Sequence, residues 1–348
     1  MTDRGAGVER IGNGPIITPA SHPSIGTNIQ GPSVIRAPAW LADPLGHYLC
    51  YFADHKGSFI RLAYADAIEG PWTIHEPGSL QLADSGFLVE DLVIDAETLE
   101  RITTRYRSAL GGQLPASLRD ELVTAHIASP DVHVDDGRCE IVMYLHGLEA
   151  LGDQRTRVAV STDGIHFRAT PETHGPSYFR CFRHDGWWYA LAMLGRFFRS
   201  CDGRTGFEEG PALFGPDMRH SAVRVVEGAN GAELEVFWTR VGDAPERILR
   251  SRVLIAGPRE RWCEIDEPVE VLRPEHAYEG ADEPCVPSIR GGVDEPVNQL
   301  RDPCLFCDPG DGTWWLFCAV AGESGIAVAR LWTREASCEL MHKVSSVG

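Results

Sequence analysis

Acidic side chains stand beside short apolar runs at several points of the chain. Asp131 lies in SPDV, Asp302 in LRDP and Glu323 in AGESG. Pairs of carboxyl groups suit acid–base chemistry, because a protonated carboxyl donates a proton while an ionised carboxylate activates water. Two of the three also have structural explanations: Asp302 before Pro303 suits a turn, and Glu323 suits a loop that faces solvent.

Basic side chains near the same runs could bind a substrate or exchange protons, namely His55, His146, Arg180, His220, Arg240 and Arg301. Imidazole titrates near neutral pH, so a histidine can act as acid, base or metal ligand, although His220 also fits a satisfied core position. We expect no required cofactor. A calcium or zinc ion held by His55, His146 and His220 with a carboxylate is the alternative, which no HxH or HExxH spacing supports.

The elements that would position these residues form a weak repeat of short apolar strands with Gly or Asp-Gly turns. Five units cover residues 32–74, 126–167, 178–200, 220–255 and 302–332. Each contains a strand, a turn, an aromatic strand and a third strand, and a fourth strand can follow. In the third unit, Asp185-Gly186 predicts a hairpin turn.

This pattern predicts an all-β fold, a single five-bladed β-propeller domain spanning residues 1–348. A β-sandwich also has many short strands, but it does not explain why the same order recurs in each unit. Residues 84–125 break the alternation with AETLERITTRYRSAL and ASLRDELVTA, which predict a helical insertion between blades 1 and 2. The insertion could cover a blade edge or form a lid over the channel mouth.

A propeller would bring the candidate residues together, because the ends of its strands converge on the axis. Asp131, Arg180, His220 and Asp302 come near the starts of first strands, and His55, His146, Arg240 and Glu323 near the ends of second strands. We therefore expect one axial site that draws on distant parts of the sequence.

Composition limits the partners. The formal charge of −18 argues against nucleic acid, whose phosphates require Lys and Arg. No signal-peptide pattern or membrane-length apolar run is present, so a cytoplasmic protein without a membrane partner is expected. We expect reduced, buried thiols at the cysteines beside strand-like runs, Cys50, Cys139, Cys181, Cys304 and Cys318.

Four short motifs resemble the five-bladed glycoside hydrolases of families 43, 62, 32, 68 and 117. They are EGPWT at 69–73, SPDV at 129–132, STDGIHF at 161–167 and LRDP at 300–303. The resemblance implies an active site in the channel with three carboxylates: an Asp from the first blade, an Asp from the second blade and a Glu acid. It also implies a carbohydrate as the bound partner.

Carried onto this chain, the resemblance makes Asp131 the second-blade Asp. At the first blade, NIQGPSVI has Asn28 and Ser33 where an acid is expected, which leaves Asp54 as the nearest carboxylate. The third blade has Arg180 and Arg183 where a Glu is expected. Divergence at these positions is therefore part of the prediction.

Glu323 is the expected general acid, because it follows the second-strand run WWLFCAV and its flanking glycines let the backbone turn there. That role requires a pKa raised toward neutrality by partial burial and by Asp131. We expect a glycoside-hydrolase-like enzyme. The alternatives are a lyase or other non-hydrolytic enzyme on a sugar-like substrate, using channel His and Arg residues, and a propeller that binds a ligand without catalysis.

Overall fold

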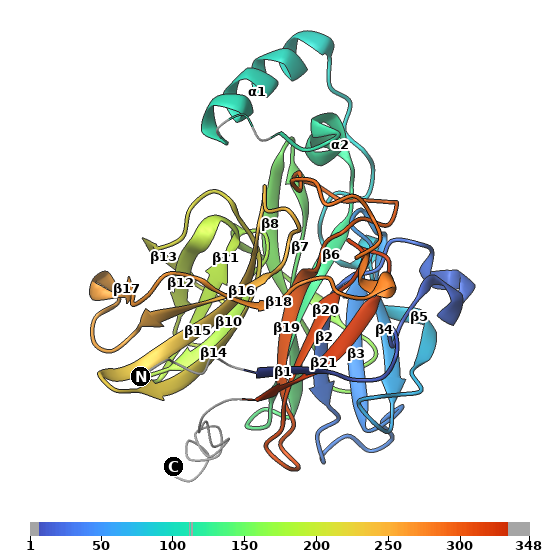
Figure 1. Cartoon of the computed structure of the whole chain (residues 1–348), viewed down its shortest axis with the longest axis vertical. Helices are drawn as coiled ribbons and strands as arrows, with labels where there is room; N and C mark the ends of the chain where they lie inside the picture. The colour runs from blue at the N-terminus through green and yellow to red at the C-terminus, as the bar shows by residue number, and fades with distance from the viewer. Residues whose placement is uncertain (1–6, 111, 113, 333–348) are drawn as a thin grey trace.

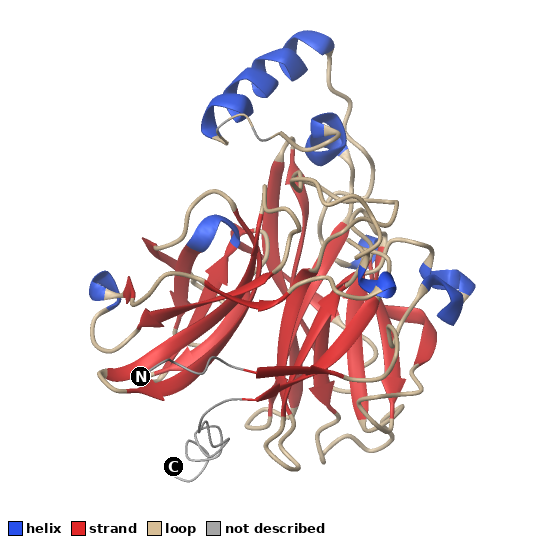
Figure 2. Cartoon of the chain, in the orientation of Figure 1, coloured by secondary structure: helices blue, strands red, loops and turns tan. Residues whose placement is uncertain are grey.

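The chain folds into five antiparallel sheets around a common axis in a computed structural model that describes residues 7–110, 112 and 114–332. Strands make up the body of the molecule, and the two α-helices stand apart at one end (Figure 2). The predicted five-bladed β-propeller is confirmed.

Blades 1 to 4 each comprise consecutive strands in the order predicted from the repeat. Blade 1 holds β2 (Gln30–Arg36), β3 (Tyr48–Ala53), β4 (Phe59–Ala65) and β5 (Thr73–Gln81), and blade 2 holds β6 (Ile127–Asp135), β7 (Glu140–Ala150), β8 (Asp153–Ser161) and β9 (Arg168–Pro176). Blade 3 holds β10 (Arg180–His184), β11 (Trp187–Ala192), β12 (Arg196–Ser200) and β13 (Glu208–Ala212). Blade 4 holds β14 (Met218–Gly228), β15 (Gly231–Arg240) and β16 (Ile248–Leu254), with β17 (Cys263–Glu264) and β18 (Val269–Leu272) both pairing with β16.

Blade 5 is built from both ends of the described chain. Its first three strands are β19 (Arg301–Cys307), β20 (Trp314–Ala319) and β21 (Ile326–Trp332), and its outer strand is β1 (Gly7–Arg10), which pairs antiparallel with β21 (Figure 1). The repeat did not reveal β1, because a four-residue strand has too little alternation to recognise. Pairing of β1 with β21 closes the ring.

The first strands of the blades surround the axis, where β2 lies between β19 and β6, and β14 lies between β10 and β19. β3, the second strand of blade 1, contains no charged residue, and every residue of it is buried. The side chains of adjacent blades pack into shared clusters, such as the one in which Cys50 and Phe52 of blade 1 meet Phe306 and Phe317 of blade 5. This packing fixes the strand ends around the axis.

The predicted helical insertion is present within residues 84–125. It contains α1 (Ala96–Ala109), which Asp95 caps by accepting the Thr98 amide, and α2 (Leu118–Val123). Both helices lie at the end of the molecule beyond β6, β7 and β8 (Figure 1). Short 3-10 helices occur at Pro19–Ser21, Pro23–Ile25, Leu82–Asp84, Met193–Gly195, Arg259–Arg261 and Ala277–Glu279.

Local turn chemistry follows the sequence. Asp185 and Gly186 have φ of 48° and 79°, which confirms the predicted hairpin turn. Of the cysteines expected to be buried, Cys139 is exposed, because it ends the turn from Asp136 to Cys139 rather than lying in β7. The nine cysteines among the described residues are free thiols. Neither α-helix of the described part has the length and apolar character needed to cross a membrane.

The closing strand also carries an ion pair that should contribute strongly to stability. Arg10 Nε lies 2.7 Å from Oε1 of Glu279, whose side chain is 2% exposed. Arg10→Ala should lower the free energy of unfolding by about 2–4 kcal/mol, because it leaves a buried carboxylate without its cation. Urea denaturation measures the change.

Arg196→Ala is the matched control, since Arg196 pairs with Glu209 on the surface, where both side chains are about half exposed. The control should cost less than about 1 kcal/mol. Equal losses in the two variants would show that the closure at β1 is not a major source of stability.

Candidate functional site

The same irregularity in four inner strands shapes the axial site. The register with the second strand gains one residue between Gln30 and Ser33, Ala128 and Asp131, Met218 and Ser221, and Arg301 and Cys304. In three of these bulges the extra residue precedes a proline and has a positive φ: 62° at Gly31, 49° at Ser129 and 47° at Asp302. A bulge re-aims the side chain of its extra residue. The three positions are therefore equivalent, and only blade 5 has a carboxylate there.

Blades 1 and 2 approach each other closely at this position. A Cβ atom on Gly31 would lie 3.1 Å from the Cα of Ser129. This crowding, together with the positive φ, explains the glycine. Of the three equivalent bulge residues, Gly31, Ser129 and Asp302, Asp302 alone has a carboxylate.

A stack of aromatic rings lies beside Asp302. The Tyr178 ring lies between those of His146 and His220, with centroid distances of 4.7 and 4.9 Å. His220 Nε2 lies 3.2 Å from the Tyr178 hydroxyl, and His220 Nδ1 accepts the Asp302 amide at 3.3 Å. All four residues are buried. A neutral His220 with its proton on Nε2 satisfies both contacts.

Asp302 combines deep burial with a carboxyl group that accepts no hydrogen bond from the described residues. The nearest ring nitrogen, His220 Nδ1, lies 3.4 Å from Oδ1. Burial and the Glu323 carboxylate raise the pKa of Asp302 to about 7, despite nearby Arg180 and Arg301. Asp302 thus retains a proton under mildly acidic conditions.

Glu323 has the opposite electrostatics. Its carboxylate accepts hydrogen bonds from Asn28 Nδ2 at 2.7 Å and Arg301 Nη1 at 2.8 Å, and Oε2 lies 3.9 Å from His55 Nδ1. Burial alone would raise the pKa of Glu323, but His55, Arg301 and Asn28 together lower it. The expected raised pKa is therefore wrong for Glu323. Its position at the axis, after the second strand of blade 5, agrees with the prediction.

Arg301 fixes the position of the Glu323 carboxylate. It is fully buried and binds Glu323, the Gln299 side chain at 2.9 Å and the Gly291 carbonyl at 3.1 Å. It therefore links blade 5 to the loop that joins blades 4 and 5. Its predicted direct contact with substrate is not required to explain its burial.

The insertion contacts the mouth of the axial site, defined here as the end at which β3 ends and His55 and Lys56 follow. Glu121 of α2 lies 2.9 Å from His55 Nε2 and 2.8 Å from Lys56 Nζ. The Gly292 amide nitrogen of the facing loop lies 3.1 Å from His55 Nε2. The insertion thus supplies a third carboxylate near the site, which the sequence did not mark because Glu121 lies in a helix with no functional motif.

Asp131 joins two blades. Its Oδ2 accepts the Cys181 amide of blade 3 at 2.7 Å and lies 2.8 Å from His133 Nε2. Ser33 occupies the equivalent position after its bulge and likewise accepts the Val132 amide of the next blade at 2.9 Å. No hydrogen bond or ion pair of the described residues joins Asp131 to Asp302 or Glu323. Asp131 lies two residues beyond the bulge, so its equivalent in blade 5 is Cys304 and not Asp302.

Arg180 also connects blades rather than occupying an open position. Its Nε donates to the Ser221 carbonyl of blade 4 at 2.9 Å, and its Nη1 to the Ser129 carbonyl of blade 2 at 3.3 Å. Its Nη2 has no hydrogen-bond partner among the described residues.

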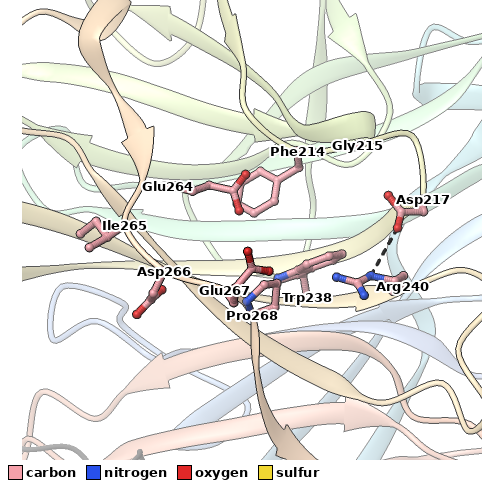
Figure 3. Close-up of a pocket in the computed structure, with 10 residues that line it drawn as sticks. All are labelled: Phe214, Gly215, Asp217, Trp238, Arg240, Glu264, Ile265, Asp266, Glu267 and Pro268. Carbon is pink, nitrogen blue, oxygen red and sulfur yellow. Dashed lines mark ion pairs between the residues drawn. The ribbon is translucent and has the colours of Figure 1, made fainter. Parts of the chain in front are cut away.

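Two other candidates lie in different surroundings. Asp54 pairs with Arg61 at 3.1 Å and accepts the Lys56 amide, so it stabilises the turn after β3. Arg240 pairs with Asp217 at 3.3 Å and lines a cavity of about 540 Å³ on blade 4, beside Trp238 (Figure 3). The structure therefore gathers neither residue with Asp302 and Glu323.

The alternative metal site is not assembled. Tyr178 separates His146 from His220, and His55 contacts two carboxylates at the mouth. Within residues 7–110, 112 and 114–332, no three His, Cys, Asp or Glu side chains are grouped so as to hold a metal ion.

Known structures share this architecture. A β-xylosidase/α-arabinofuranosidase of family 43 from a compost metagenome superposes with a TM-score of 0.53 at 13% identity, over 94% of this chain and 96% of its own. An endo-arabinase from Bacteroides thetaiotaomicron gives 0.51 at 11% identity, over 89% and 96%. The chain thus has the five-bladed fold of the family 43 glycoside hydrolases.

The sequence comparison identifies the family itself. The chain is 34% identical over 325 residues to the uncharacterized protein R118 of Acanthamoeba polyphaga mimivirus, covering 87% of this chain and 83% of that protein. It belongs to the same family as that protein. No protein-family model matches the chain.

The raised pKa of Asp302 predicts a pH-dependent cost to stability. An unfolded Asp releases its proton near pH 4, whereas folded Asp302 retains it until about pH 7. Wild-type stability from this group is therefore full below pH 4 and is lost as pH rises to about 7, by up to roughly 4 kcal/mol. The Asp302→Asn variant, which has no proton to lose at this position, would carry no such penalty.

The measurement is urea denaturation of wild type and Asp302→Asn from pH 4 to pH 8. The advantage of the variant should grow across this range and level off above about pH 7, because other titrating groups cancel in the difference. If the difference is the same at every pH, Asp302 is ionised in the folded protein over the whole range and its pKa is not raised.

Proposed function

We propose that this protein cleaves a glycosidic bond of a carbohydrate bound at the propeller axis. The observation that carries the proposal is the Asp302 carboxyl group, which is buried at an axial bulge, accepts no hydrogen bond from the described residues and has a pKa of about 7. Such a group is suited to donate a proton to a leaving oxygen. The shared fold of family 43 glycoside hydrolases supports a sugar as the substrate.

In the proposed reaction, Asp302 and Glu323 have complementary roles. Asp302 protonates the leaving oxygen as the glycosidic bond breaks, and water attacks the anomeric carbon and releases its proton to ionised Glu323. Arg301 and Asn28 keep Glu323 ionised and oriented. Its charge in turn keeps the proton on Asp302. The reaction needs no cofactor.

A second candidate is elimination from a sugar-like substrate with His146 as the base. His146 Nδ1 is buried without a hydrogen-bond partner among the described residues, and burial holds its pKa well below the usual value, so the ring is neutral. Mass spectrometry of the products separates the two reactions, since hydrolysis adds one water and elimination does not.

Asp302→Asn should lower turnover of natural oligosaccharides by about two orders of magnitude or more, because the proton donor is lost. Aryl glycosides with good leaving groups need little protonation and should lose much less. Steady-state kinetics on both substrate types measure the difference, and Asp54→Asn is the control that should retain activity. Equal losses on the two substrate types would contradict the role of Asp302 as the acid.

The pH profile gives an independent check. Turnover should fall as pH rises through about 7, where Asp302 loses its proton. Glu323→Gln removes the charge that raises this pKa, so the alkaline limb of its residual activity should move to lower pH. If the alkaline limb does not move, the charge of Glu323 does not raise the pKa of the acid.

A further inference from the structure

Glu121 places a carboxylate on a cationic cradle at the mouth of the axis. The cradle is defined here as His55, Lys56 and Gln154, whose Nε2, Nζ and Nε2 atoms lie 2.9, 2.8 and 3.3 Å from the Glu121 carboxylate. Charge-assisted contacts of this kind are those by which proteins hold carboxylates. The cradle therefore has the chemistry of a carboxylate-binding site, now filled by a side chain of the same chain.

The cradle and its occupant belong to different parts of the molecule. His55 and Lys56 follow β3 of blade 1, and Gln154 lies on β8 of blade 2, so the propeller itself supplies all three. Glu121 comes from α2 of the insertion. The cradle would persist if the insertion moved.

The insertion has an apolar cluster of its own and is not part of a blade core. Its apolar side chains pack into a separate small cluster around Leu118, Leu122 and Val123, and α1 contains no buried residue. Its contacts with blade 2 include the Gly152 amide on the Leu122 carbonyl at 2.9 Å. Segments with few buried contacts, such as α1, open at low free-energy cost. Opening α2 must in addition break the contacts of Glu121 with His55 and Lys56.

The cradle lies next to Glu323, one of the proposed catalytic groups. The other nitrogen of the His55 ring, Nδ1, lies 3.9 Å from Glu323 Oε2. Burial alone would lower the pKa of His55, but Glu323 and Glu121 raise it, which favours the protonated ring. A ligand carboxylate on the cradle would thus lie one imidazole ring away from Glu323.

We propose that the cradle is a subsite for the carboxylate of an acidic sugar, a uronic acid residue, and that Glu121 occupies it until the substrate displaces the insertion. This inference rests on the proposed function, because it assumes that a carbohydrate enters at this mouth. It assigns the substrate class and gives the insertion the role of a competing lid. The substrate carboxylate replaces that of Glu121 on Lys56 and His55, so no charge is left unpaired on the cradle.

The test measures binding of D-glucuronate and D-glucose by calorimetry to the whole protein. Wild type should bind glucuronate more tightly than glucose. Glu121→Gln should tighten glucuronate binding by about tenfold and leave glucose unchanged, because it removes the competing charge. Glu97→Gln, the same change on an exposed residue of α1, is the control and should alter neither.

Two further measurements separate an acidic-sugar site from a general effect on the lid. Lys56→Met should abolish the preference for glucuronate, and acetate should not reproduce glucuronate binding. Amide hydrogen exchange over residues 96–123 should rise when glucuronate binds. An equal gain for glucose in Glu121→Gln, or acetate binding as well as glucuronate, would overturn the proposal.

The two proposals fail separately. Asp302→Asn should bind glucuronate as wild type does while losing turnover. Selective glucuronate binding without turnover of any glycoside would remove the proposed function and retain the carboxylate subsite. Turnover of glycosides without a preference for glucuronate over glucose would remove the carboxylate subsite and retain the proposed function.

Discussion

The extra residue in the inner strands is the constraint on which the axial site depends. A regular strand would turn alternate side chains toward the two neighbouring blades, and none would be aimed along the axis. The bulge separates two tasks. Its extra residue, as at Asp302, faces the axial groups, and the second residue after it, as at Ser33 and Asp131, binds an amide of the next blade. A position that faces the axial groups and a position that joins two blades thus lie within three residues of the same strand.

Two acids of the same blade have opposite protonation because their hydrogen-bond partners differ. Glu323 accepts hydrogen bonds from an arginine and an amide, which stabilise its charge. Among the described residues none donates a hydrogen bond to the Asp302 carboxyl group, which is exposed to the charge on Glu323. Burial penalises both carboxylates, so the partners decide which one ionises. The protein therefore creates an acid and an anion from two similar groups without a metal ion in the proposed reaction.

The fold could be predicted from sequence because each blade repeats the same local pattern of apolar strands and turns. Most strands that pair within a blade are also close in sequence. The site was only partly predictable. SPDV and LRDP both place an Asp next to a proline, yet the bulge makes Ser129, not Asp131, the equivalent of Asp302. Glu121 gave no signal at all, because its contact with His55 joins residues that are 66 positions apart through a helix with ordinary composition. Hydrogen-bond register and long-range contacts of this kind are set by the folded chain.

Closure of the ring by β1 and β21 has a consequence for the order in which the protein matures. Blade 5 carries Arg301, Asp302 and Glu323, and its sheet is complete only when the strand made first meets the strand made last among the described elements. Contacts of such high sequence separation form late, because the loop between them must be ordered first. A ribosome-bound chain would hold four formed blades without these three residues in place. The proposed acid–base chemistry at the axis would therefore begin only after synthesis has passed β21.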